Sequence, residues 1–265
     1  MTKWAWMALL AFSVGGCAVK NVREQAVQEQ PAPPMQTQTI KLGRSVKGQP
    51  ITLELFNTGA NPIFIMGGIH GDERASVFIA ERLAELLREQ PELTQGKPIA
   101  ILAVASPDGY EADTRTNVNG VDLNRNFPAS NFHEATARSR TGPYPMSEPE
   151  TQAIMAALNM LEPRLIISIH SIRDGRECNN YDGPNGQWIA ALMSTYNGYP
   201  SVGYIGYPTP GSMGTYAGMD RGIPMVTLEV PRSDSGEQAW EKNREALLAV
   251  IRSDPPQPQA DAQAK

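Results

Sequence analysis

The sequence is poor in several kinds of residue that would mark other protein classes. Its 265 residues include 2 cysteines, 3 histidines and 7% aromatic side chains, beside 23 glycines and 22 prolines. No block of basic residues occurs and the formal net charge is −5, which argues against a nucleic-acid partner. Few aromatics with much glycine and proline favour a loop-rich enzyme over a helical bundle. The hydrophobic content of 41% is enough for one well-buried core.

The first residues read as a targeting segment. Lys3 precedes an apolar run over residues 5–14, which is too short to span a bilayer comfortably. The run ends in Val-Gly-Gly-Cys17, which resembles the cleavage site of bacterial lipoproteins. An ordinary secretory signal cleaved nearby and an uncleaved anchor are the alternatives. We expect residues 1–17 to be a lipoprotein signal peptide, with lipid-modified Cys17 anchoring an exported protein at the periplasmic face of the cell envelope.

Two segments have the composition of flexible chain. Residues 18–39, rich in Gln, Pro, Val and Glu, are predicted to be a tether, and residues 253–265 a disordered tail. The folded domain is then residues 40–252, expected to be a monomer. If Cys17 carries lipid, Cys178 is the remaining thiol and no intrachain disulfide can form. We interpret Cys178 as an incidental thiol near the mouth of the site.

Strand and helix patterns alternate through the domain. The predicted strands are residues 51–56, 62–66, 99–105, 164–169 and 225–230. The predicted helices are residues 74–90, 147–161, 187–196, a short one up to 221, and 238–252. Ser147 and Glu150 have the spacing of a capping box. The expected fold is α/β, a mixed, mostly parallel sheet with helices on both faces, whose ligands gather beyond the carboxyl ends of the strands.

Two of the three histidines lie at predicted strand ends and carry the functional interpretation. His70 and Glu73 occur in GGIHGDE, whose glycines allow a sharp turn, and His170 ends IISIH. Two imidazoles and a carboxylate are the ligand set of a hydrolytic zinc centre that keeps one position open for water. Each motif alone is weak, since His-x-x-Glu occurs by chance and a hydrogen-bonded histidine at a strand end is ordinary. His133 lies in a polar stretch and reads as a surface residue.

Glu229 is the candidate general base. It lies in an apolar predicted strand, MVTLEV, where a charge without a partner would be costly. A water bound to the metal gives this carboxylate a reason to be there, since such a centre needs a proton shuttle.

Four motifs in order resemble the M14-type zinc carboxypeptidases: GGIHGDE, TRTNVNGVDLNRNFP, SIHS and TLEVP. The resemblance covers nearly all of residues 50–250. Within the family, GYPTPGSMGTYAGMDRGIPMVTLE is similar to the murein peptide amidase branch, which cleaves between γ-D-glutamate and meso-diaminopimelate. The resemblance implies one zinc ion bound by His70, Glu73 and His170.

The same resemblance implies roles for further residues. Asp122 would hold the ring of His70, Arg115 would polarise the scissile carbonyl, and Glu229 would be the base. Asn124 and Arg125 would bind the substrate's free carboxylate, which suits the planar fork of a guanidinium. The plainer interpretations are a turn cap for Asp122 and a surface charge for Arg125. Tyr207 matches the mobile tyrosine that closes over the substrate, with Tyr204 and Tyr216 as alternatives.

The substrate is less determined than the chemistry. The neutral Met213 indicates no strong preference for Lys or Arg side chains. Diaminopimelate needs polar partners, and four residues after His170 are either those partners or solvated charges: Arg173, Asp174, Arg176 and Asp182. We expect a zinc hydrolase for murein peptides. The alternatives are a carboxypeptidase for ordinary peptides, a small-molecule deacylase, and a non-catalytic lipoprotein that binds wall peptides.

Overall fold

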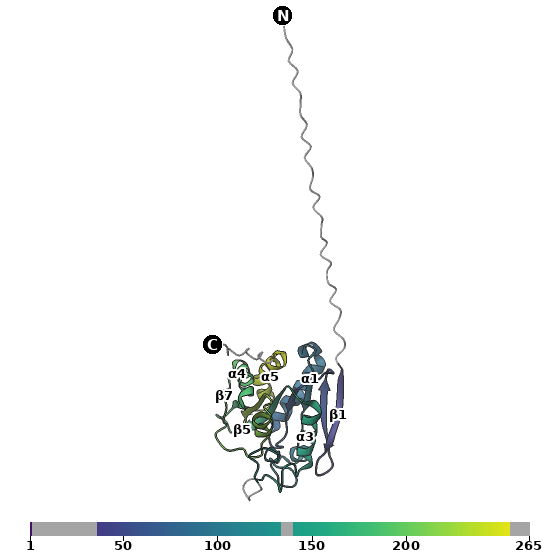
Figure 1. Cartoon of the computed structure of the whole chain (residues 1–265), viewed down its shortest axis with the longest axis vertical. Helices are drawn as coiled ribbons and strands as arrows, with labels where there is room; N and C mark the ends of the chain where they lie inside the picture. Colours follow the sequence, from purple (N-terminus) through teal and green to yellow (C-terminus); the bar gives the residue numbers. More distant parts are fainter. Residues whose placement is uncertain (2–35, 134–139, 255–265) are drawn as a thin grey trace, which may run out of the picture. The chain divides into compact units, whose positions relative to one another are not determined.

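The computed structural model describes residues 1, 36–133 and 140–254 of the chain (Figure 1). Its strands form an 8-stranded sheet in the order β1-β2-β4-β3-β5-β8-β6-β7. The strands are β1 Thr37–Arg44, β2 Pro50–Phe56, β3 Ile63–Met66, β4 Ile99–Leu102, β5 Leu165–Ile172, β6 Cys178–Asp182, β7 Ser201–Val202 and β8 Met225–Pro231. Nearly all of the predicted signal peptide and tether and most of the tail lie outside the described residues, although β1 begins within the predicted tether.

The helices separate the strands as the alternating pattern predicted. They are α1 Arg74–Glu89, α2 Pro107–Ala112, α3 Pro149–Leu161, α4 Gln187–Asn197 and α5 Gly236–Arg252. Short turns of helix are η1 Pro91–Thr94, η2 Leu123–Arg125, η3 Pro184–Gly186 and η4 Gly214–Asp220. Among the described residues, no helix is both long and apolar enough to cross a membrane.

The centre of the sheet is parallel and its flanks are antiparallel. Strands β4, β3, β5 and β8 run in one direction, while β2 pairs antiparallel with β4 and β6 antiparallel with β8. The carboxyl ends of the central strands therefore meet at one edge, where ligands collect in such sheets. This arrangement confirms the predicted fold class.

Each central strand is apolar on both sides because helices cover both faces. In β3, Ile63 and Ile65 face the layer of α1, α4 and α5, and Phe64 and Met66 face the layer that contains α3. All four side chains are fully or almost fully buried. Burying a side chain of this size contributes roughly 1.5–3 kcal/mol, so the two layers hold the sheet rigid beneath its edge.

Several local predictions were wrong. The predicted capping box at Ser147 is absent: α3 begins after Glu148, whose backbone N–H donates to Asn126 Oδ1, and Ser147 Oγ donates to Glu148 Oε1. The predicted strand 99–105 ends at Leu102. The strand 164–169 continues to Ile172, so His170 lies inside β5 and not at its end.

Some elements were not predicted because local sequence does not show them. Strand β6, CNNYD, has no apolar alternation and is held by pairing with β8.

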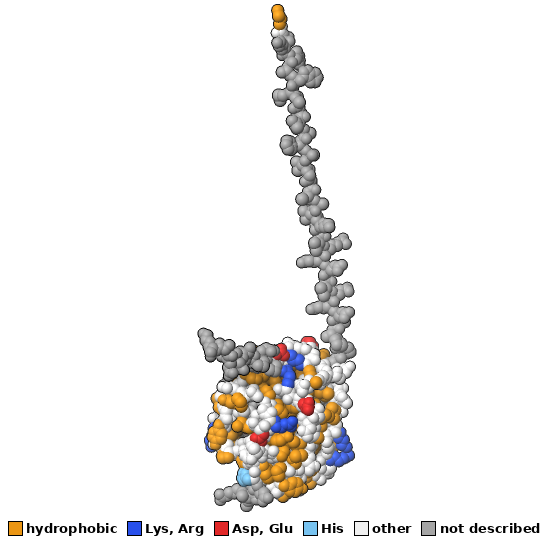
Figure 2. Space-filling model, in the orientation of Figure 1, with side chains coloured by type: hydrophobic (Ala, Val, Ile, Leu, Met, Phe, Trp, Pro, Cys, Tyr) orange, Lys and Arg blue, Asp and Glu red, His pale blue; other side chains and the backbone are white. Residues whose placement is uncertain are grey.

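On the face drawn in Figure 2, acidic and basic side chains are interspersed among apolar ones. That mixture agrees with the modest net charge of −5.

Candidate active site

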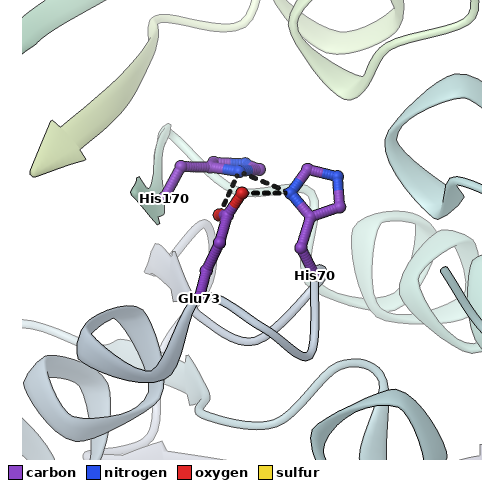
Figure 3. A group of neighbouring side chains, drawn as sticks. All are labelled: His70, Glu73 and His170. Atoms are coloured by element: carbon purple, nitrogen blue, oxygen red, sulfur yellow. Dashed lines mark hydrogen bonds and ion pairs between the residues drawn. The ribbon is translucent and has the colours of Figure 1, made fainter. Parts of the chain in front are cut away.

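Three side chains, His70 and Glu73 from the loop after β3 and His170 from β5, meet at the edge of the sheet (Figure 3). His70 Nδ1 lies 2.8 Å from Glu73 Oε1, His170 Nδ1 lies 3.1 Å from Glu73 Oε2, and the two Nδ1 atoms are 3.2 Å apart. Atoms bound tetrahedrally to one zinc ion at ~2.0–2.1 Å lie roughly 3.3 Å from one another. All three side chains are buried, so the cluster has the dimensions and donors of a metal site.

The loop between β3 and α1 places His70 and Glu73. Gly68 takes a positive φ of +61°, which turns the chain after β3. Gly71 does not have a positive φ, so the expectation that this glycine serves the turn was wrong. A Cβ there would lie 1.9 Å from the carbonyl carbon of Gly109, so α2 packs directly on the loop.

Each imidazole ring is held from its far side by a partner of Nε2, so that its Nδ1 atom faces the Glu73 carboxylate and the other Nδ1 atom. His70 Nε2 lies 2.9 Å from Asp122 Oδ1, and His170 Nε2 lies 3.0 Å from Ser168 Oγ. Because a carboxylate only accepts, the Asp122 contact keeps a proton on Nε2 and leaves Nδ1 of neutral His70 as a lone pair. Asp122 thus lies behind His70, and its Oδ1 also caps the turn that follows by accepting from Asn124 N–H at 3.0 Å. The contact of Ser168 with His170 was not foreseen.

The electrostatics of the His70–Glu73–His170 cluster favour a positive charge among the three side chains. Burial lowers the pKa of His70, but the carboxylates of Glu73 and Asp122 outweigh it and raise that pKa to about 9. Burial likewise raises the pKa of Glu73, and the imidazoles of His70 and His170 hold it well below its usual range. Two imidazole lone pairs beside a carboxylate repel unless a proton or cation lies between them. The donor set fits zinc, which such N and O ligands bind.

Arg115 is tied to the ligands. Its Nη1 donates to Glu73 Oε1 at 3.1 Å and its Nε to Asp122 Oδ2 at 3.0 Å. Nη2 has no hydrogen-bond partner within the described part of the chain, and about a third of the side chain is exposed. Arg115 thus neutralises the carboxylates while one N–H edge faces the pocket.

Glu229 lies beside His170 because β5 and β8 pair in register at these two residues. Burial raises the pKa of Glu229 to about 7, helped by the negative Glu73 and opposed by His170. A bound cation would lower this pKa, since it favours the charged form. A carboxylate poised near neutral pH beside a metal site suits proton transfer.

The sequence-predicted residues line one pocket, with Asp122 behind it. The lining includes His70, Glu73, Arg115, Asn124, Arg125, His170, Tyr207 and Glu229. Asn124 Oδ1 accepts from Met213 N at 2.9 Å, which turns the amide so that its NH2 remains a donor. The Arg125 guanidinium adds further donors beside it, so the pair presents N–H groups where an anion can bind.

Among the three candidate tyrosines, Tyr207 and Tyr204 line the pocket. The pKa of Tyr207 is raised by burial and then by Glu229, which places its hydroxyl near the charged centre. Tyr216 instead packs against Phe127, with ring centroids 6.3 Å apart. The geometry therefore favours Tyr207 or Tyr204 over Tyr216.

The part of this pocket lined by β6, which we call the inner pocket, contains groups that the sequence did not predict or for which it left two roles possible. Asn180 and Asp182 from β6 line it with Thr227 of β8. Of the four polar residues considered after His170, only Asp182 reaches this pocket. Met213 is buried in the core and does not line the pocket, so it cannot read the substrate there.

We predict that Asp122→Asn weakens zinc binding by about 10–100-fold, because the ring of His70 loses its charged partner. Zinc titration of the metal-free protein measures this. Asp113→Asn, at an exposed carboxylate paired with Arg74, removes the same charge elsewhere and should bind zinc as the wild type does. Equal affinities in both variants would contradict the assignment of Asp122.

Known proteins resemble the chain in sequence and fold. The zinc carboxypeptidase family, peptidase M14, matches residues 25–176. Murein peptide amidase A of Escherichia coli (strain K12) is 33% identical over 235 residues, covering 82% of this chain and 90% of that protein. Murein peptide amidase A of Vibrio campbellii is 30% identical, covering 80% and 87% respectively.

Solved structures agree. The murein-tripeptide amidase of Escherichia coli O157 aligns with a TM-score of 0.64 at 29% identity, over 85% of this chain and 94% of that one. Bovine thrombin-activatable fibrinolysis inhibitor, with a TM-score of 0.69 at 22% identity over 81% and 88%, shares the fold. With a buried His-Glu-His cluster at the edge of the same kind of sheet, the chain belongs to the zinc carboxypeptidase family, peptidase M14, and is a hydrolytic enzyme.

Proposed function

We propose that the enzyme removes diaminopimelate from murein peptides by cleaving the γ-D-glutamyl–diaminopimelate amide bond. Similarity to murein peptide amidase A over most of both chains supports this substrate class. The observation that carries the proposal is the chemistry of the inner pocket. It is polar and ends in a carboxylate that lacks a cation.

Asp182 is that carboxylate. Burial alone raises its pKa to about 6, and it has no ion-pair partner among the described residues. Its Oδ2 accepts a long 3.4 Å hydrogen bond from Asn180, whose own Oδ1 is buried with no partner. A carboxylate with one long hydrogen bond and a buried amide oxygen with none favour an ammonium group as ligand. The distal amine of diaminopimelate is such a group.

The pocket runs along the face of the sheet from the reaction centre to this carboxylate. In the β6–β8 ladder, Glu229 pairs with Cys178 and Met225 pairs with Asp182. Four residues of strand separate these two levels, or about 13 Å. A side chain that enters past Glu229 therefore reaches Asp182 only if it is long, as that of diaminopimelate is.

The chain's own groups account for the reaction. Bound zinc would supply Lewis acidity that acidifies water and polarises a carbonyl. Glu229 accepts the proton of the attacking water and then donates it to the leaving amine nitrogen. Arg115 offers its free N–H edge to the developing oxyanion, a contribution of the kind that is often the largest in catalysis. Asn124 and Arg125 hold the terminal carboxylate, which restricts cleavage to chain ends.

A carboxypeptidase for ordinary peptides ending in lysine is the second candidate, because Asp182 also suits a lysine ammonium. Incubation with a γ-D-glutamyl–meso-diaminopimelate tripeptide and with hippuryl-lysine separates the two. We expect the tripeptide to be the better substrate.

We predict that Glu229→Gln lowers kcat on the tripeptide by about 10²–10⁴-fold, because the variant has no base for the attacking water. Zinc content and KM should stay near those of the wild type, since Gln keeps the shape of the side chain. Steady-state kinetics with metal analysis provide the measurement. Turnover close to the wild-type value would remove Glu229 from this role.

Asp182→Asn should have two opposite effects. On the tripeptide, kcat/KM falls by about 10–100-fold because the ammonium loses its charged partner. Stability instead rises near neutral pH. A carboxyl whose pKa rises from 3.8 to about 6 on folding destabilises the folded state as pH increases through that window, by up to about 3 kcal/mol.

Urea denaturation at about pH 4.5 and about pH 7.5 tests the sign, with Asp113→Asn as the exposed control. The advantage of Asp182→Asn over the wild type should grow with pH, whereas Asp113→Asn should show no such trend. A pH-independent difference for Asp182→Asn would show that folding does not raise the pKa of the Asp182 carboxyl.

We further propose that the enzyme is exported and held in the envelope by lipid on Cys17, which lies outside the described residues. The apolar run and Val-Gly-Gly-Cys support this. Labelled palmitate should enter the wild type and Cys178→Ser, where the buried thiol is removed, but not Cys17→Ser. Label in the Cys17 variant would disprove the anchor.

A further inference from the structure

A second groove opens where β5 and β8 end. Four residues line it, and we call it the arginine groove: Arg173, Asp174, Arg232 and Ser233. The two arginines directly follow the paired strand ends, since Ile172 pairs with Pro231 and Arg232 N–H donates to Ile172 O at 2.8 Å. None of the four lines the substrate pocket, so the groove is a separate surface on the same edge of the sheet.

The groove adjoins the metal ligands. Arg232 Nη1 donates to Asp72 Oδ2 at 3.0 Å, and Arg232 Nη2 lies 3.8 Å from Glu73 Oε1. About half of the Arg232 side chain is exposed. A ligand in the groove would therefore lie within a few atoms of the reaction centre, on a flank of Glu73 that the substrate pocket does not use.

The positive charge of the groove is incompletely neutralised. Arg232 is shared with Asp72, whereas Arg173 is exposed and has no ion pair or side-chain hydrogen bond within the described residues. The carboxylate of Asp174 accepts from Ser233 N–H at 3.0 Å, and this contact lowers the pKa of Asp174. Asp174 is thus bound to backbone, and Arg173 keeps donors for an anion from outside.

The geometry of the substrate peptide indicates which anion would bind in the arginine groove. In the proposed function, on which this inference rests, the leaving residue fills the pocket toward Asp182 and Asn124. The acyl half of the substrate must then leave the centre on another side. A glutamyl residue linked through its side-chain carboxyl keeps its main-chain carboxylate free, only a few bonds from the scissile carbonyl.

We propose that Arg173 and Arg232 form a subsite for a carboxylate on the acyl side of the scissile bond. Guanidinium groups bind carboxylates by paired, charge-assisted hydrogen bonds. The enzyme thereby distinguishes γ-linked glutamyl peptides that have a free α-carboxylate from those in which this group is a carboxamide.

Two synthetic tripeptides test the subsite, identical except for a carboxylate or a primary carboxamide on the glutamyl α-carbon. Wild-type kcat/KM should favour the carboxylate by about 10-fold or more, since a hydrogen bond to a charged group is lost in the other. Arg173→Gln should bring the ratio close to one, and Arg173→Lys should keep part of it. Arg244→Gln, at an exposed arginine of α5, should keep the wild-type ratio.

The outcomes separate this inference from the proposed function. Cleavage of both tripeptides at equal rates by the wild type, or an unchanged ratio in Arg173→Gln, overturns the subsite and leaves the proposed function standing. Failure to cleave either tripeptide overturns the proposed function and the subsite with it. Arg232→Gln should also lower the ratio, and its zinc content shows whether a loss of activity comes from the metal site.

Discussion

The repulsion among two imidazole lone pairs and a carboxylate organises this protein. Nδ1 of His70, Nδ1 of His170 and the oxygens of Glu73 lie within about one zinc-ligand spacing of one another. Such a group favours a positive charge among its members, and the carboxylates of Glu73 and Asp122 accordingly raise the pKa of His70. Asp122 and Ser168 prevent the rings from turning away, and the fold holds the cluster together despite this repulsion.

A rigid scaffold is needed for that, and the parallel centre of the sheet provides it. His170 and Glu229 are register partners, so the distance from the candidate metal ligand to the candidate base is set by backbone hydrogen bonds. The close approach of Gly71 to Gly109 fixes the loop that carries the other two ligands. Arg115 and Arg232 surround Glu73 with cations, which offsets the cost of burying carboxylates together.

In the proposed function, side-chain binding and catalysis fall on different parts of the sheet. The candidate metal site and Glu229 lie at the carboxyl edge, whereas Asn180 and Asp182 lie further back along the face that β6 and β8 share. A largely buried carboxylate without an ion-pair partner costs stability, and a ligand cation in the proposed function would offset that cost. Such local conflicts with folding are expected at functional sites.

The sequence by itself predicted the fold class from apolar periodicity, and its short motifs indicated His70, Glu73, His170 and Glu229 as one candidate site. The candidate roles of Asn124 and Arg125 came from the resemblance of those motifs to a known family. The sequence did not determine the role of Asp182, since β6 has no strand pattern and exists through pairing with β8. The capping box at Ser147 failed because the Glu150 carboxylate accepts instead from Val46 N–H and Asn117 Nδ2, both distant in sequence, and the Ser147 N–H donates to Tyr144 O. Met213 is buried in the core and Arg232 lies beside Glu73, and both positions result from packing between segments distant in sequence. Which side chains share a pocket depends on strand pairing and packing between distant segments, and only the tertiary structure decides those.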